Sequence, residues 1–211
     1  MPNGPRFPGR DVLSHPRLKQ LARLDTPQKV QDFLDSLPIN FEKRGETCSS
    51  PLASLERGSV HCLEGAFVAC LALWMNGKPP LVMDLQTTDD DVDHVVTLFK
   101  FRRHWGAISK TNHGVLRFRE PIFRDLRELA ASYFHEYSLP DGRKTLRFYS
   151  APFDLRRYKG DWITTPEPLW TLEREIDQSR HFKLLNRSHI ARLRRASKIE
   201  IRAGRLVEWR G

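Results

Sequence analysis

The stretch HCLEGAFVACLALWM, residues 61–75, predicts the clearest helix of the chain, apolar on nearly every side and therefore buried. Ser59 can cap its N-terminus, and Asn76-Gly77 supply residues that tolerate the left-handed turn that ends a helix. Its most apolar part, Ala66 to Met75, is far too short to cross a bilayer. We therefore expect no membrane partner.

Short runs of strand-forming residues follow this helix. Leu81 to Leu85 predicts one strand and His94 to Phe101 a second. Residues Arg102-Arg103-His104 predict a turn, after which Trp105 to Ser109 forms the returning strand. The order predicts an α+β fold in which the buried helix packs on a small antiparallel sheet.

Weaker patterns place the remaining elements. Pro27 to Leu37 predicts a helix, with Asp25 or Thr26 as its cap and Pro27 at its first position. The other expected elements are helices over residues 121–137 and 166–180, the latter capped by Thr165, a strand over 145–149, and a hairpin around Ala203-Gly204.

Composition separates the two ends from the middle of the chain. Residues 1–20 are rich in proline and predict a flexible leader, and residues 21–180 a single domain. The chain carries 35 Lys and Arg against 26 Asp and Glu, a net charge of +9. Residues 181–211 hold nine of these cations and two acids, so this basic appendage contributes nine minus two, or +7. It is either a solvated surface or a contact for a polyanion.

The same composition narrows the class of protein. A chain of 211 residues with 39% hydrophobic and 29% charged residues is typical of a globular protein and not of a disordered one. The first ten residues lack the apolar segment of a signal peptide, and three cysteines do not form a disulfide framework. These features favour a cytoplasmic location. The oligomeric state stays open.

One cysteine and one histidine occupy positions suited to nucleophilic chemistry. Cys62 lies in the first turn of the predicted buried helix, and His94 begins a strand 32 residues later. The helix dipole and the free amides of the first turn favour a thiolate and can hold an oxyanion. An imidazolium nearby would favour the thiolate further and protonate a leaving group.

Three segments carry a resemblance to a known family: GSVHCLEGA at 58–66, DHVV at 93–96 and WGAIS at 105–109. They resemble the core of the transglutaminase-like branch of the papain-type cysteine superfamily. The resemblance implies a papain-like fold and thiol-dependent acyl chemistry, by hydrolysis or transfer, on a small amide, peptide or protein substrate. It assigns Cys62 as nucleophile and His94 as base.

The third position of the triad departs from the family pattern. Where the family has tryptophan followed four residues on by aspartate, this chain has Trp105 followed by Ser109. A serine hydroxyl can orient the imidazole but brings no charge. Asn112 is a second candidate, whereas Asp93 is expected on the opposite face of the strand from His94. The alternative is an inactive domain that binds a protein or nucleic acid.

Other reactive residue types carry weaker signals. Cys70 is expected in the core, Cys48 in an exposed loop, and Glu64 as a helix-start charge that could raise the thiol pKa. The histidine spacing and the absence of a Cys-x-x-Cys pair predict no zinc site. Residues 89–93 predict a solvated acidic turn and no calcium loop. No cofactor is implied.

Overall fold

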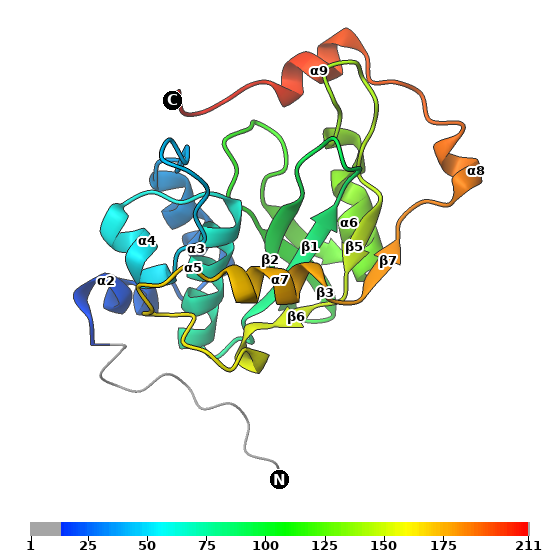
Figure 1. Ribbon diagram of the computed structural model, residues 1–211. Coiled ribbons are helices and arrows are strands. Elements are labelled where there is room, and N and C mark those ends of the chain that lie inside the picture. Colours follow the sequence, from blue (N-terminus) through cyan, green and yellow to red (C-terminus); the bar gives the residue numbers. More distant parts are fainter. Residues whose placement is uncertain (1–13, 211) are drawn as a thin grey trace.

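The computed structural model describes residues 14–210, and they form an α+β fold built around one antiparallel sheet (Figure 1). The strand order is β4-β3-β2-β1-β5-β7, and β6 pairs with the far end of β1. The strands are β1 (Leu81–Gln86), β2 (His94–Phe101), β3 (His104–Ile108), β4 (Arg119–Phe123), β5 (Phe148–Ser150), β6 (Phe153–Asp154) and β7 (His181–Lys183).

Helices cover both faces of this sheet. Val82 packs in one hydrophobic cluster with α5, and its neighbour Met83 packs in a second cluster with α6, because successive side chains of a strand point to opposite faces. The helices are α2 (Pro16–Lys19), α3 (Pro27–Ser36), α4 (Pro51–Arg57), α5 (Cys62–Met75), α6 (Leu126–Tyr133), α7 (Trp170–Asp177), α8 (Arg187–Ile190) and α9 (Lys198–Gly204). Short 3₁₀ turns are η1 (Gln20–Arg23), η2 (Phe134–Glu136) and η3 (Leu155–Arg157).

The predicted buried helix is α5, which lies against the sheet as expected. Residues from Leu63 to Leu73 are all buried, and Thr97 of β2 donates a hydrogen bond to the carbonyl of Ala66 at 2.9 Å. The N-cap is His61, not Ser59, because the Glu64 carboxylate accepts from the His61 amide at 3.2 Å. Cys62 is consequently the first residue of the helix.

The central strands match the sequence prediction closely. β2 spans the expected residues and forms a hairpin with β3, in which Phe101 pairs with His104. Arg102 adopts a φ of 53° in the two-residue turn, as such a tight hairpin requires. β1 runs antiparallel to β2, with Leu85 opposite His94. This pairing places His94 at the end of the central strands that lies next to the start of α5.

Two expected elements are wrong in type. Residues 119–123 form β4, not the start of a helix, because they pair with β3; α6 begins later, where Asp125 accepts from the Glu128 amide at 2.8 Å. The expected hairpin around 203–204 is helix α9, whose first turn is fixed by a 2.6 Å bond from the Ser197 amide to Glu200.

Two others are shifted in position. The expected strand over 145–149 lies at Phe148–Ser150, where β5 can pair with β1. The expected helix over 166–180 is shortened to Trp170–Asp177, since Pro166 and Pro168 precede it in an irregular segment.

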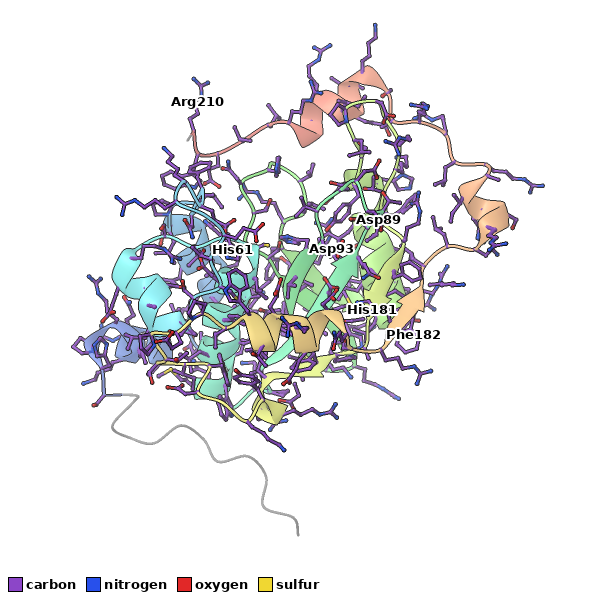
Figure 2. All side chains as sticks on the ribbon, viewed as in Figure 1. His61, Asp89, Asp93, His181, Phe182 and Arg210 are labelled. Atoms are coloured by element: carbon purple, nitrogen blue, oxygen red, sulfur yellow. The ribbon has the colours of Figure 1, made fainter. Side chains whose placement is uncertain are left out.

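The ends of the chain are more integrated than the sequence suggested. Of the expected leader at 1–20, residues 1–13 lie outside the described part, while α2 begins at Pro16 and Leu18 is fully buried. Of the basic appendage at 181–211, His181 to Lys183 form β7 within the sheet (Figure 2). The segment beyond it returns to the body, where Leu206 accepts from the Gly114 amide at 2.8 Å. Within residues 14–210 no helix has the length and apolar character needed to cross a membrane.

Candidate active site

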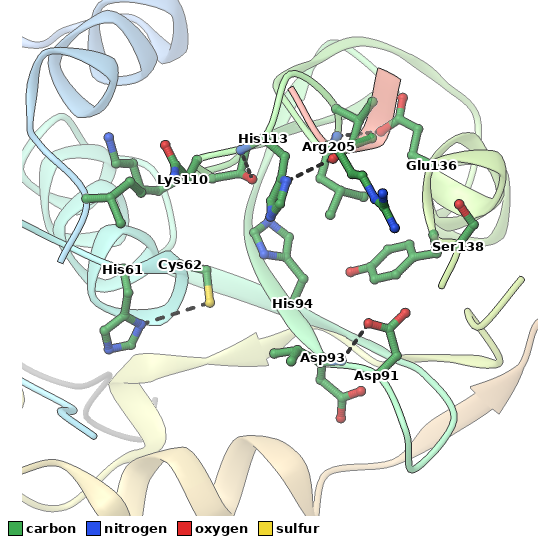
Figure 3. Close-up of a pocket in the computed structure, with 18 of the residues that line it drawn as sticks. His61, Cys62, Asp91, Asp93, His94, Lys110, His113, Glu136, Ser138 and Arg205 are labelled. Atoms are coloured by element: carbon green, nitrogen blue, oxygen red, sulfur yellow. Dashed lines mark hydrogen bonds between the residues drawn. The ribbon is translucent and has the colours of Figure 1, made fainter. Parts of the chain in front are cut away.

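Cys62 lies between two histidines at the N-terminus of α5 (Figure 3). His61 Nδ1 is 4.0 Å from its sulfur, and buried His94 lies on the other side. Burial raises the pKa of the Cys62 thiol, but the contact with His61, the proximity of His94 and the charges of both rings outweigh burial and lower the pKa to about 6. The geometry therefore favours a thiolate at neutral pH.

His61 contacts Cys62, and this contact was not predicted from the sequence. Its Nε2 is 2.8 Å from the carbonyl of Thr47, which only accepts, so Nε2 carries a proton and Nδ1 faces the sulfur. Burial lowers the pKa of His61, but the hydrogen bond with Cys62 and the charge of Glu64 raise it to about 9. Its position immediately before Cys62, at the helix cap, was the available signal.

Glu64, in the first turn of α5, stabilises the positive charge of His61. The carboxylate is fully buried, 2.5 Å from Arg57 Nη2 and 3.7 Å from His61 Nε2. Its negative charge favours the imidazolium form of His61, which in turn favours the thiolate. The carboxylate also accepts hydrogen bonds from the amides of Ser49 and His61 and from the side chains of Asn40 and Thr47.

Ser109 holds the other histidine. His94 Nε2 is 2.8 Å from Ser109 Oγ, and the serine hydroxyl donates to the Leu116 carbonyl at 2.5 Å. Its single proton is used there, so the ring N–H of His94 donates to Ser109, and Nδ1 is left for the cysteine. Leu116 has a φ of 60°, a left-handed conformation that an apolar residue adopts only when its surroundings enforce it.

Gln31 of α3 fixes the backbone of Ser109 and was not predicted. Its side-chain oxygen accepts from the Ser109 amide at 2.9 Å, and its Nε2 donates to the Ser109 carbonyl at 2.8 Å. The amide is buried and also donates to Asp35 at 2.9 Å. A glutamine on an amphipathic helix gives no sequence signal for such a contact 78 residues away.

The other sequence-predicted residues lie elsewhere. Asn112 bonds the backbone of Trp209: its Nδ2 donates to the carbonyl at 3.0 Å and its Oδ1 accepts from the amide at 2.8 Å. The structure therefore brings Ser109, and not Asn112, to His94. Asp93 accepts from the amide and hydroxyl of Thr87 at 2.7 and 2.8 Å, so its carboxylate is engaged away from the His94 ring.

Two cavities meet at Cys62, and His61 lines both of them. The first, about 400 Å³, includes His94 and Tyr137 in its wall, and α9 and the residue after it contribute Ile201, Gly204 and Arg205. The second, about 320 Å³, is lined by Trp170 and by six acidic residues: Glu42, Glu46, Asp84, Asp93, Glu173 and Asp177. Cys62 thus lines two cavities of different charge, because Lys110 and Arg205 line the first, whereas the second has, among the residues that the structure describes, six acids and no Lys or Arg in its wall.

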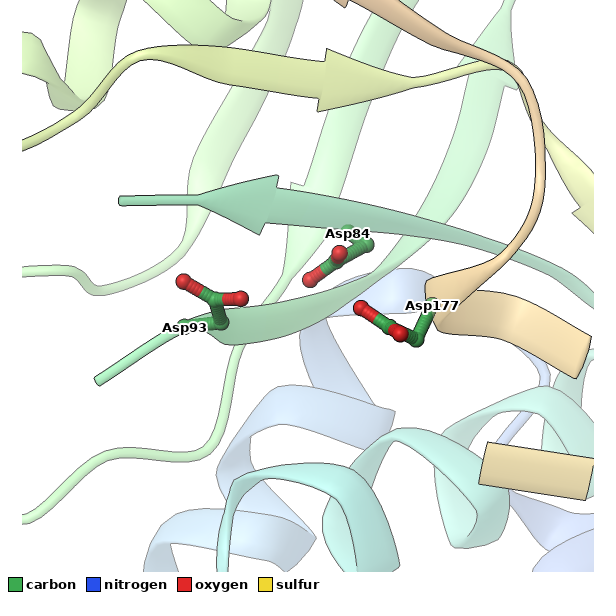
Figure 4. Close-up of side chains that lie close together, drawn as sticks. All are labelled: Asp84, Asp93 and Asp177. Carbon is green, nitrogen blue, oxygen red and sulfur yellow. The ribbon is translucent and has the colours of Figure 1, made fainter. Parts of the chain in front are cut away.

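Three of these acids lie close together. Each offers one carboxylate oxygen, and these oxygens lie within 4.8 Å of one another; the residues are Asp84, Asp93 and Asp177 (Figure 4). Carboxylates at this spacing can ligate a divalent cation, but Asp84 already receives a 3.0 Å contact from His181 Nε2, and Asp93 is engaged by Thr87. We assign no metal to this cluster.

The remaining thiols are unsuited to reaction. Cys48 is buried, with 1% of its surface exposed, and not in an exposed loop as expected; the reason is that Leu169 packs over it and donates its amide to the Cys48 carbonyl at 2.7 Å. Burial raises the pKa of Cys48 to about 12 and that of Cys70 still further. All three cysteines are free, and Cys62 alone of them has a lowered pKa.

No protein-family model matches this sequence, and no curated protein is significantly similar to it.

Proposed function

We propose that the chain is a cysteine acyl-transfer enzyme or hydrolase with a papain-like core of the transglutaminase-like type. Support comes from the order of elements: a cysteine begins the buried helix α5, a histidine begins β2, and its orienting serine follows β3. The observation that carries the proposal is Cys62 between two imidazoles, which lower its pKa to about 6. We place this chemistry in a reducing cytoplasm, where the thiol stays free.

The reaction would begin with attack of the Cys62 thiolate on the carbonyl carbon of an amide, peptide or ester. A C–S bond forms and the carbonyl π electrons move to oxygen; when the carbonyl reforms, the bond to the leaving group breaks. His94 acts here as the imidazolium, which carries a second proton on Nδ1, and gives that proton to the departing amine to become neutral. Water or an amine, deprotonated by His94, then attacks the thioester and releases Cys62. Water gives hydrolysis and an amine gives transfer.

The two histidines would have different roles, one in stabilising the thiolate and the other in proton transfer. His61 hydrogen-bonds Thr47 through Nε2 and lies against Glu64, so it is held as a cation that stabilises the thiolate. His94 has its Nε2 on neutral Ser109 and its other nitrogen toward the site, so it is the group free to exchange a proton with substrate. Within residues 14–210, Ser109 takes the place of a carboxylate at His94, and Glu64 supplies a carboxylate at His61.

The test uses p-nitrophenyl acetate as an acyl donor, with release of p-nitrophenolate followed in time. We expect one rapid equivalent per protein and an acetyl group on the peptide that carries Cys62, at a rate at least about 100-fold above that of a free thiol of equal pKa. Cys62→Ser should abolish the burst, and His94→Gln should strongly slow the later phase, in which His94 deprotonates the attacking water. An alkylamine that accelerates the later phase would indicate transfer.

Matched controls are the two other cysteines. Cys48→Ala and Cys70→Ala remove thiols that are buried and protonated, so both variants should keep the burst. Acetylation at the rate of an ordinary thiol, or a later phase unaffected by His94→Gln, would contradict enzymatic acyl chemistry and favour a domain that only binds.

A second function, polyanion binding, is favoured by a basic cavity beside the C-terminal segment. This cavity of about 260 Å³ has five cations and no acid among its lining residues, which are Thr88, Arg143, Lys144, Thr145, Arg147, Ile190, Leu193, Arg194 and Arg195. Arg143 lies 2.6 Å from Asp90, and Arg195 lies 3.2 Å from Asp141. These ion pairs fix the positions of the two guanidinium groups at the cavity. A chain of phosphate or sulfate groups fits such a surface.

Heparin chromatography tests this second function. Arg147→Gln should elute at lower salt than the wild type, whereas Arg124→Gln, which removes the same charge from an exposed site beside Glu128 on α6, should elute close to it. Equal elution of the two variants would show that net charge alone governs retention and would contradict a site at this cavity.

A further inference from the structure

Tyr137, which follows η2, has a buried hydroxyl with no hydrogen-bond partner within residues 14–210. Only 4% of the residue is exposed. Leaving a buried hydroxyl unpaired costs about 1–3 kcal/mol, so such a group is uncommon without a reason. Packing does not supply the reason, since a phenylalanine would fill the same space in the cluster around α6.

The neighbouring tyrosine shows what a structural hydroxyl does in this core. Tyr133, on the same side of the sheet, is also buried and donates to the Arg117 carbonyl at 3.2 Å. Tyr137 differs in that it lines the cavity of about 400 Å³ that contains Cys62 and His94. The residue that carries the unpaired hydroxyl is therefore part of the wall of the candidate active site.

Two other donors in the wall of this cavity are already used. Lys110 Nζ is bonded to the carbonyls of Leu34 and Leu37 at 2.8 and 2.5 Å, and Asn112 is paired with Trp209. The Tyr137 hydroxyl has no such commitment. Burial, followed by the negative charge of Cys62, raises its pKa well above the usual value, so it keeps its proton at neutral pH.

We propose that the Tyr137 hydroxyl donates a hydrogen bond to the substrate's carbonyl oxygen during attack by Cys62; this rests on the proposed acyl chemistry. As the C–S bond forms, the carbonyl oxygen gains the negative charge that leaves the sulfur, and the hydrogen bond from Tyr137 strengthens. The first-turn amides of α5, which begins at Cys62, lack intrahelical acceptors and would be further donors to this oxygen. When the carbonyl reforms, the leaving group departs and Tyr137 retains its proton.

Two reagents separate this role from an effect on the thiol. Acylation by p-nitrophenyl acetate passes through an oxyanion, whereas alkylation by iodoacetamide does not. Tyr137→Phe should slow acylation of Cys62 by about 100-fold, the usual cost of losing one such donor, and leave alkylation within about twofold. Tyr133→Phe is the matched control, and its ratio of acylation to alkylation should equal that of the wild type.

Urea unfolding adds an independent readout. Removing an unpaired hydroxyl from a buried site should leave the unfolding midpoint of Tyr137→Phe unchanged or raise it. A lower midpoint, or a variant that fails to fold, would show that the hydroxyl has a structural partner and would overturn the inference. Equal acylation rates, or equal losses in acylation and alkylation, would overturn it as well. Failure of the wild type to be acylated would instead overturn the proposed function, and this inference with it.

Discussion

The imidazole of His94 donates to Ser109, with 2.8 Å between Nε2 and Oγ. The direction of this bond follows from the 2.5 Å contact of the serine hydroxyl with the Leu116 carbonyl, which takes the only proton that the serine has. One tautomer of His94 is thereby selected, with Nδ1 free for Cys62. The serine supplies orientation, and unlike an aspartate it adds no charge to the imidazolium.

Ser109→Ala should therefore impair the reaction without removing a catalytic atom. We expect deacylation of Cys62, followed as the later phase with p-nitrophenyl acetate, to slow by about 10- to 100-fold, a part of what general acid–base catalysis contributes, because His94 can then rotate or change tautomer. Asn112→Ala is the comparison, since Asn112 bonds Trp209 and not His94. A larger loss in Asn112→Ala than in Ser109→Ala would assign the orienting role to the amide.

The pH dependence of alkylation tests the electrostatics of the site. The rate with iodoacetamide should stay nearly constant from pH 9 down to about 7 and fall to half near pH 6, where Cys62 takes up its proton. An ordinary cysteine, with a pKa of about 8.5, would lose most of its rate by pH 7.

His61→Gln provides the matched variant for this profile. Loss of the imidazolium removes a hydrogen bond and a positive charge that lower the pKa of Cys62, so the midpoint should move to higher pH. Glu46→Gln removes an acid from the rim of the second cavity and should shift the midpoint little. A midpoint near pH 8.5 in the wild type would contradict an activated thiol.

Sequence patterns sufficed for the elements whose preferences are local. The apolar run of α5 and the alternating residues of β2 each form one kind of structure in almost any context, and both lie where expected. Residues 119–123 have no such local preference. They form a strand because they pair with β3, and this tertiary contact cannot be seen in a short stretch of sequence. The local signal for α9, in place of the expected hairpin, is its capping box of Ser197 with Glu200.

The residues of the candidate active site also differ in whether local sequence predicts them. Cys62 and His94 occupy the starts of predicted elements, so their proximity could be expected from element order. His61 and Gln31 act through contacts that depend on how the Thr47 loop and α3 pack against the site. No periodicity encodes such contacts, and they define the electrostatic and positional support of the two central residues.

Gln31→Leu should lower the free energy of unfolding. Both hydrogen-bonding groups of the Ser109 backbone lose their partner in a buried place, which costs about 2–6 kcal/mol at about 1–3 kcal/mol for each group. Urea unfolding followed by circular dichroism measures this change. Gln178→Leu is the control: Gln178 is exposed at the end of α7, and its variant should stay within about 0.5 kcal/mol of the wild type. Equal stabilities would contradict the role of Gln31.

The contact between His181 and Asp84 should make stability depend on pH. His181 of β7 lies 3.0 Å from the buried Asp84 carboxylate of β1, and this hydrogen bond, opposed by burial, raises the pKa of His181. The folded state thus holds the proton more tightly than the unfolded chain, where the pKa is about 6.5. The resulting stabilisation is fully present below pH 6.5 and is lost as pH rises through the folded-state pKa.

His181→Gln keeps a neutral donor and removes only the charge. Near pH 6 its free energy of unfolding in urea should fall about 1–2 kcal/mol below that of the wild type, as for a hydrogen bond between charged groups, and at pH 9 the difference should shrink toward zero. Asp177 also faces His181 and favours its charged form, so Asp177→Asn should reduce the effect in the same direction. A difference that is the same at both pH values would mean that His181 is neutral in the folded protein and stabilises the β7 edge by packing alone.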